Sequence, residues 1–522
     1  LNARNELIKD KNIINLNNNN LKINLIQQNN EEENNLIIKN NELSLIEANN
    51  YYEEEDDDDD SIKLILGYTK DNWPISKEEY SEEWFDNVPI DHYSYLNSKT
   101  FKLRYLINID YFKQKNAPIF IVLGAESTVV WNPPAFGFVY DIAPLFGAAI
   151  IFAEHQNMGY LSPEQAMGDY ALLIKYLKEQ RLSNANKSPV IAFGGSYGGL
   201  LVAWMRVKYP HLVDGGIAAS APVRYFENVP FTIDSSFYDI IAKDFLYYGC
   251  TTQMILKTFD AIRQLANTSE GRKFLNENYK LSPLSQINVP SDSEHLINAF
   301  TSNMAYMAMW NYNEFYKPFP INISCQGFVS AKTSEQIALA LYPTFDLLYA
   351  KTNNTFQLWN LNDDELEDSE RYGWDWLTCT ELIVTLCSRG PPFDLFDKNC
   401  PFNESDSLES CLEEFSKFGY NEALFRPNWA TTNYGYDFTT ATNLVFTNGI
   451  FDPWSGGGWR QTTTNVGSVY SYITDGGHCY DIRRARADDT QSIKDIRRLE
   501  TIHIGEWIHQ AKFKITNSTD GE

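Results

Sequence analysis

The stretch VIAFGGSYGGLLVAWMRVKYP, residues 190–210, joins a short apolar run to a helical pattern. The run VIAFG is typical of a buried strand, and the part from Gly199 onward has the apolar content of a helix that Pro210 ends. Ser196 lies between the two, with glycines at positions 194, 195, 198 and 199. These glycines indicate a very sharp turn, at which strand and helix come too close together to accommodate side chains.

Short apolar runs of the same kind recur along the chain, apolar on both faces, as in the central strands of a parallel sheet. They are residues 117–124, 148–154, 189–194, 215–220, 443–449 and 468–474. Helical stretches lie between several of them, and the clearest, residues 162–180, begins with Ser162 as a cap and Pro163 at the first helical position. This alternation predicts an α/β fold.

The composition divides the chain into parts. Residues 1–60 hold 15 acidic and 5 basic side chains among many asparagines, which predicts a disordered Asn/Asp/Glu-rich arm. Residues 84–221 and 431–512 carry the alternating pattern, and we predict that they form one α/β domain. Residues 222–430 break the pattern, are rich in aromatic residues and hold six of the seven cysteines. We predict a large, mostly helical cap domain there, inserted between the two parts of the α/β domain.

The overall composition excludes several classes of function. The formal net charge of −26 argues against nucleic acid as a partner, because phosphates would be repelled. No apolar run reaches 18 residues, so we expect no membrane span. No cysteines form a CxxC pair, and we expect neither a metal nor a cofactor. The cysteines and six Asn-x-Ser/Thr sequons favour a lysosomal or secreted protein, although no signal peptide is visible from Leu1 onward.

The motif G-x-S-x-G at residues 194–198 is the pattern of a nucleophile elbow, which makes Ser196 the candidate nucleophile. In α/β-hydrolases the partners follow in the order Ser, Asp, His. Asp452 and His478 each follow a predicted strand, and α/β sheets build their sites at the carboxyl ends of strands. We therefore predict a Ser-His-Asp triad in an α/β-hydrolase domain formed by residues 84–221 and 431–512, with the helical cap inserted between the nucleophile and the acid/base strands. The oxyanion would be bound by the N–H groups of Tyr197 and of Ala125, in the loop LGAES at residues 123–127.

Taken together, these motifs resemble the family of prolyl carboxypeptidase and dipeptidyl peptidase II, which includes thymus-specific serine protease relatives. The resemblance covers about residues 84–512 and includes WDWLTCTE (374–381), NGIFDPWSGGGW (448–459) and GGHCYDIR (476–483). It implies a serine exopeptidase that cleaves short peptides after proline through an acyl-enzyme. The cut would release either a C-terminal residue or an N-terminal dipeptide, and the sequence leaves both open. The family also allows a homodimer.

The same resemblance implies further site residues. Trp454 and Leu200 match positions near the slot for proline, although either could instead be packed in the core. Glu126 and Glu381 are candidates for binding the substrate, and for Glu381 this means holding a peptide amine.

The cysteines fit the family in part. The resemblance implies pairs between Cys250 and Cys325 and between Cys379 and Cys411. Phe231 stands at the family partner position of Cys387, so Cys400 becomes its alternative partner and Cys479 is left over.

Two departures from the family keep alternatives open. A family loop after Glu154 and His155 is missing, which would suit a catalytically impaired hydrolase-fold binding protein. The loop at residues 123–127 departs from the family form, which leaves the second oxyanion donor open. An esterase is a third reading, against which the large insertion argues. Any enzyme working in an acidic compartment must also oppose the effect of Asp452, which raises the pKa of His478. Arg483 and Arg484 are the candidates for this.

Overall fold

The computed structural model of the chain describes residues 79–94, 96–124, 128–154, 160–230, 233–312, 319–328, 331–344, 351–352, 355–356 and 368–519. The arm predicted at residues 1–60 lies outside these ranges.

A mixed eight-stranded sheet forms the centre of the molecule, in the order β1-β2-β4-β3-β5-β6-β9-β10. Its strands are β1 (Ser81–Pro89), β2 (Thr100–Asn108), β3 (Ile119–Leu123), β4 (Ala149–Ala153), β5 (Val190–Gly195), β6 (Gly215–Ala219), β9 (Leu444–Gly449) and β10 (Val469–Thr474). The six predicted strands are all present, and they pair in parallel. The first two strands run antiparallel and were not predicted. β1 lies at the edge and is largely exposed, so its sequence lacks a continuous apolar run.

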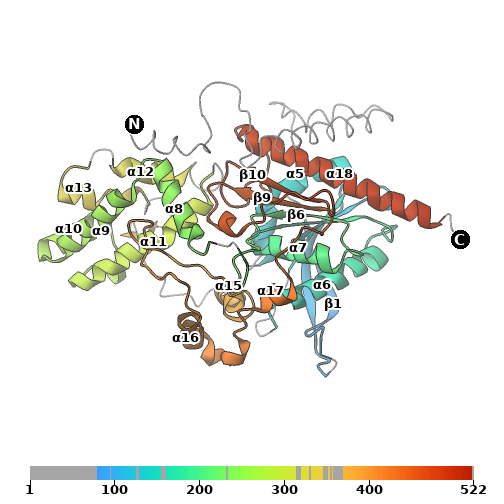
Figure 1. Cartoon of the computed structure of the whole chain (residues 1–522), viewed down its shortest axis with the longest axis horizontal. Helices are drawn as coiled ribbons and strands as arrows, with labels where there is room; N and C mark the ends of the chain where they lie inside the picture. The colour runs from blue at the N-terminus through green and yellow to red at the C-terminus, as the bar shows by residue number, and fades with distance from the viewer. Residues whose placement is uncertain are drawn as a thin grey trace.

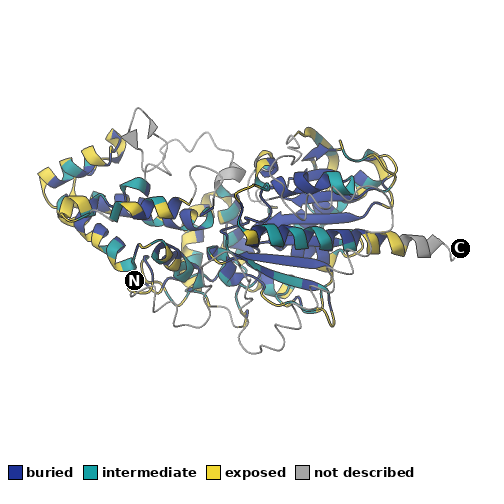
Figure 2. Cartoon of the chain, turned by 90° about the horizontal axis from the view of Figure 1, so that it is seen from above, coloured by how far each residue is buried: buried dark blue, intermediate teal, exposed yellow. Residues whose placement is uncertain are grey.

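Helices cover both faces of this sheet (Figure 1). Because side chains alternate between the two faces along each strand, the sheet separates two apolar cores. In β3, Ile119, Ile121 and Leu123 join one core, and Phe120 and Val122 join the other. The first core packs against α6 (Pro163–Tyr176) and α7 (Tyr197–Lys208), and the second against α5 (Gly137–Phe146) and α18 (Gln491–Thr519). The strands are accordingly buried between the helices (Figure 2).

A body of helices lies beside the sheet, at the left of Figure 1. It contains α8 (Ser236–Tyr247), α9 (Thr252–Ala266), α10 (Ser269–Asn278), α11 (Ser293–Met309), α12 (Pro320–Cys325) and α13 (Ser334–Ala338). These helices share an apolar core that is separate from the two cores of the sheet. The remaining elements are α4 (Asn132–Ala135), β7 (Lys351–Thr352), β8 (Thr355–Phe356), α15 (Asp368–Thr380), α16 (Glu404–Phe415) and α17 (Trp429–Asn433).

Three disulfides brace the helices. They join Cys250 to Cys325, Cys379 to Cys411, and Cys387 to Cys400, which are the pairs that the sequence led us to expect. Cys479 remains a free, buried thiol. In the part of the chain that the structure describes, no helix is both long and apolar enough to cross a membrane.

The packing of α18 against the sheet gives a test of the fold. A Cβ added to Gly215 in β6 would lie 2.1 Å from the ring of Trp507 in α18. We therefore expect Gly215→Ala to lower the free energy of unfolding by about 1–3 kcal/mol, because neither backbone can retreat without repacking. Val207→Ala, an exposed position on α7, is the control and should change it by less than about 0.5 kcal/mol. Equal unfolding curves for Gly215→Ala and the wild type would contradict this packing.

Candidate active site

Ser196 lies at the junction of β5 and α7, in a backbone conformation that few non-glycine residues adopt. Its φ and ψ are 57° and −126°. A Cβ on Gly194 would lie 2.2 Å from the carbonyl oxygen of Gly198, and a Cβ on Gly198 would lie 2.9 Å from that of Leu123. The Ser196 N–H donates to the carbonyl oxygen of Ala219 at 2.9 Å. The glycines are therefore required because strand and helix cross in contact, and that contact holds Ser196 at the carboxyl end of the sheet.

His478 and Asp452 are hydrogen-bonded to each other. The Nδ1 atom of His478 lies 2.9 Å from Oδ1 of Asp452, and the backbone N–H of Trp454 donates to the same oxygen at 3.0 Å. Both residues follow neighbouring parallel strands, β9 and β10, and their loops touch. A Cβ on Gly449 would lie 2.3 Å from the carbonyl oxygen of Gly476. The sheet thus brings His478 and Asp452 together from positions 26 residues apart.

The loop that carries His478 also meets the strand that precedes Ser196. The backbone N–H of Cys479 donates to Oγ of Ser220, just after β6, at 2.9 Å. A Cβ on Gly195 would lie 2.7 Å from Sγ of Cys479. The Nε2 atom of His478 is buried and has no hydrogen-bond partner among the described residues. Among the described residues, no group therefore occupies that nitrogen, and its loop contacts the end of β5 that precedes Ser196.

The environment of His478 favours its charged form. Burial alone would lower the pKa of the imidazole, but the carboxylate of Asp452 and the thiol of Cys479 raise it well above its ordinary value of 6.5. Of the two arginines expected to oppose this effect, Arg484 is paired with Asp141 at 3.3 Å. The guanidinium of Arg483 lies 5.6 Å from the ring centre of Tyr312.

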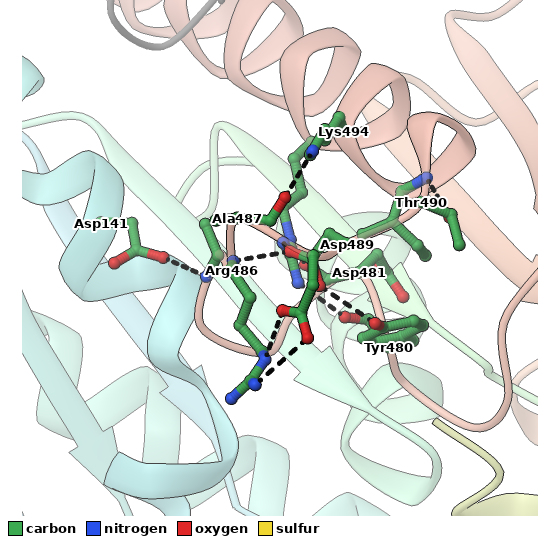
Figure 3. A network of polar contacts seen from close by, with 12 residues as sticks. Asp141, Tyr480, Asp481, Arg486, Ala487, Asp489, Thr490 and Lys494 are labelled. Atoms are coloured by element: carbon green, nitrogen blue, oxygen red, sulfur yellow. Dashed lines mark hydrogen bonds and ion pairs between the residues drawn. The ribbon is translucent and has the colours of Figure 1, made fainter. Parts of the chain in front are cut away.

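The chain after His478 is fixed by buried polar contacts with α18 (Figure 3). Arg497 of this helix donates to the backbone oxygens of Asp481 at 2.7 Å and Tyr480 at 3.0 Å, and it pairs with Asp489. The hydroxyl of Tyr480 donates to Asp489 at 3.0 Å, and both groups can be followed in Figure 3. These contacts restrict the loop, so α18 helps to fix the position of the His478 imidazole.

The body of helices holds the same loop from the other side. The backbone N–H of His478 donates at 2.8 Å to the carbonyl oxygen of Met309, the last residue of α11. A Cβ on Gly477 would lie 2.6 Å from that oxygen. The rings of Tyr312 and Tyr480 stack with 4.8 Å between their centres. The position of His478 thus depends on α11 as well as on the sheet.

Aromatic rings gather beside Asp452. The ring centre of Trp454 lies 4.9 Å from that of Phe237 and 6.1 Å from that of Trp374, which in turn lies 6.3 Å from that of Tyr197. Sequence reasoning did not assign Phe237 or Trp374 to the site. The motif WDWLTCTE contained the signal for Trp374, whereas nothing in the sequence around Phe237 indicated it.

The other predicted residues have different surroundings. Leu200, in the first turn of α7, is fully buried in the core that α7 shares with the sheet. Glu381 is buried and binds Arg426, with the hydroxyl of Tyr434 at 3.4 Å, so a peptide amine would have to compete with Arg426 to reach it. Ala125, Glu126 and residues 155–159 lie outside the described residues, so the predicted oxyanion loop and the region after Glu154 are not described. Within the described ranges, no group of three or more His, Cys, Asp or Glu residues could hold a metal ion.

Comparison with known proteins places this chain. The family model "Serine carboxypeptidase S28" matches residues 88–500. The chain belongs to the S28 family of serine peptidases.

Curated relatives of this S28 peptidase cover most of its length. Prolyl carboxy peptidase like protein 5 of Caenorhabditis elegans is 38% identical over 85% of this chain and 93% of its own. Human lysosomal Pro-X carboxypeptidase is 34% identical, over 83% of this chain and 90% of its own. Mouse thymus-specific serine protease is 24% identical, over 82% and 88%. The family and these relatives identify the chain as a serine peptidase.

A carboxyl pair in this S28 peptidase gives a prediction on stability. Burial, and next the neighbouring carboxyl group of Glu164, raise the pKa of Glu381 from 4.5 to about 8. Between these two pH values the folded chain binds a proton that the unfolded chain releases, so the free energy of unfolding falls as the pH rises. We expect it to be about 1–3 kcal/mol lower at pH 8 than at pH 5, and Glu381→Gln to remove most of that slope.

Thermal unfolding between pH 5 and pH 8 measures this slope. Glu335→Gln, which removes an exposed carboxylate, is the matched control and should keep the wild-type slope. A Glu381→Gln variant with an undiminished slope would show that the proton is bound elsewhere.

Proposed function

We propose that this peptidase cleaves short peptides after proline through an acyl-enzyme formed on Ser196, with His478 as base and Asp452 as acid. The observation that carries the proposal is the hydrogen bond between His478 and Asp452, together with the vacant Nε2 of His478 on a loop that contacts the end of β5. Two relatives, named Pro-X carboxypeptidase and prolyl carboxy peptidase like protein, support the preference for proline.

The chemistry follows from these positions. Nε2 of His478 accepts the proton of the Ser196 hydroxyl as its oxygen attacks the carbonyl carbon, and then returns that proton to the leaving amine. Asp452 accepts a hydrogen bond from the Nδ1–H of His478, which fixes the tautomer and stabilises the imidazolium. The Tyr197 N–H, at the start of α7, binds the oxyanion. The hydroxyl of Tyr170 already accepts the N–H of Gly124 at 3.1 Å. A second oxyanion donor must therefore come from further along the loop, and we assign it to Ala125.

The aromatic cluster supplies a slot for the proline ring. Trp454 would form one wall, with Phe237 and Trp374 supporting it. Proline is compact and apolar and lacks an N–H, so flat apolar walls favour it over residues with polar or longer side chains. We further propose that the helices between β6 and β9 form a cap domain over this slot, because the slot is built from both parts of the chain.

The disulfides and the exposed glycosylation sequons of the chain fit a lysosomal or secreted location. Three disulfides persist best in an oxidising compartment. Four of the sequon asparagines lie exposed in the structure: Asn186, Asn267, Asn322 and Asn403. The Pro-X carboxypeptidase relatives carry the word lysosomal in their names.

Fluorophosphonate labelling tests the nucleophile. We expect the wild type to be labelled on one serine and Ser196→Ala to lose both the label and all peptide turnover, because the proposed mechanism has this hydroxyl as its only nucleophile. Ser183→Ala, an exposed serine, is the control and should behave as the wild type. Turnover of X-Pro reporters against Pro-X peptides then shows which end of the peptide is read. A wild type that turns over neither would favour the binding-protein alternative.

Substitution of Trp454 tests the slot. We expect Trp454→Leu to lower kcat/KM for a proline substrate by about 10–100-fold while affecting the alanine analogue much less, because the lost ring contacts only the larger group. Trp84→Leu removes a half-exposed tryptophan on β1 and serves as the control. Equal losses for proline and alanine would place the proline elsewhere.

A further inference from the structure

Helix α8 runs along the segment that carries Asp452. At its start, the ring centre of Phe237 lies 4.9 Å from that of Trp454. At its end, the ring centre of Tyr248 lies 6.4 Å from that of Phe451. Asp244 lies between them on the same helix face, since positions 237, 241, 244 and 248 are spaced at one helical turn. Asp452 occupies the matching place between Phe451 and Trp454. The two carboxyl groups therefore lie on facing segments.

Both carboxyl groups are removed from water. Asp244 is 1% exposed and Asp452 is fully buried. In each of them Oδ2 is buried and has no hydrogen-bond partner among the described residues. Buried polar atoms rarely stay unpaired, and two buried carboxylates on facing segments cannot both be ionised without a large cost. A single proton held between them, directly or through one buried water, satisfies both oxygens at once.

The surrounding charges agree with such a proton. Burial, and next the charge of Asp452, raise the pKa of Asp244 well above its ordinary value, and the exposed Lys243 opposes this only in part. On the other side of Asp452 lie His478, which is bonded to Oδ1, and Arg460, whose pKa is lowered by burial.

Two tyrosines and one more carboxyl group complete the surroundings. Tyr225 lies within the field of Asp452, and burial raises its pKa, so it stays neutral. Tyr248 lies near both Asp244 and Asp475, and its pKa is raised to about 12, mainly by burial. Neither tyrosine carries a charge that would neutralise Asp244 in place of a proton.

We propose that Asp244 is a positioning residue that shares one proton with Asp452, so that the acid of the triad presents less than a full negative charge to His478. The inference rests on the proposed function. Its consequence is a weaker base: an imidazole facing a partly neutralised acid stays uncharged at lower pH. Arg484 is paired with Asp141 and Arg483 lies against the ring of Tyr312, so we assign to Asp244 a share of the role that the sequence led us to give to these arginines.

The test is the pH dependence of kcat/KM on a proline-containing reporter, read as the pH below which activity falls. Asp244→Leu removes the proton donor, and we expect this pH to rise by about one unit. Asp244→Asn keeps a permanent hydrogen-bond donor of the same shape. We expect the pH below which activity falls to stay within about 0.3 unit of the wild type, even if the maximal kcat/KM changes. Asp239 lies on the same helix as Asp244 and pairs with Arg389. The variant Asp239→Asn removes this carboxylate and is the control for a general charge effect.

Each outcome decides the matter. A downward move in Asp244→Asn would mean that Asp244 is ionised in the wild type and would overturn the inference. An unmoved Asp244→Leu would do the same. If Asp244→Leu does not fold, as judged by its thermal transition, Asp244→Asn decides alone. Ser196→Ala separates the two levels. If it retains turnover, the proposed function itself fails. If it is inactive while the predicted shifts are absent, only the shared proton is refuted.

Discussion

The architecture of the site depends on one contact that leaves no room for side chains. Where β5 turns into α7, a Cβ on Gly194 would lie 2.2 Å from the carbonyl oxygen of Gly198. This crossing forces Ser196 to a φ of 57°. The strained turn costs stability, and it persists because a fully buried strand and the buried first turns of α7 hold it on both sides. The same constraint directs the first N–H groups of α7 toward the space above Ser196.

His478 is held by elements from two parts of the chain. Arg497 of α18 binds the backbone of the residues that follow His478, and Met309 at the end of α11 accepts its N–H. Helix α8, which contributes Phe237 to the aromatic cluster, shares its apolar core with α11. A shift of this body of helices would therefore move Phe237 and the imidazole of His478 together.

Sequence reasoning reached the parts of this structure that leave a local trace. The parallel strands were predicted because they are buried on both faces, and the elbow because its glycines follow from steric contact. Strands β1 and β2 were missed. β1 is mostly exposed, and the first half of β2 is only partly buried, so neither has a continuous apolar sequence. Phe237 and Asp244 could not be placed, because their roles come from packing between helices and loops far apart in sequence. Trp374 lies in the motif WDWLTCTE, but only the packing of its ring near Trp454 assigns it to the aromatic cluster. The pairing of Arg484 with Asp141 likewise depends on a contact across 343 residues.

The central claim is that the side chains of Ser196, His478 and Asp452 act on one carbonyl group. A crystal structure of the enzyme inactivated by a proline phosphonate tests it most directly. The account predicts phosphorus bonded to Oγ of Ser196, a phosphoryl oxygen on the Tyr197 N–H, Nε2 of His478 within hydrogen-bond distance of the adduct, and the proline ring against Trp454. An adduct on another residue, or one that the imidazole of His478 cannot reach, would contradict it.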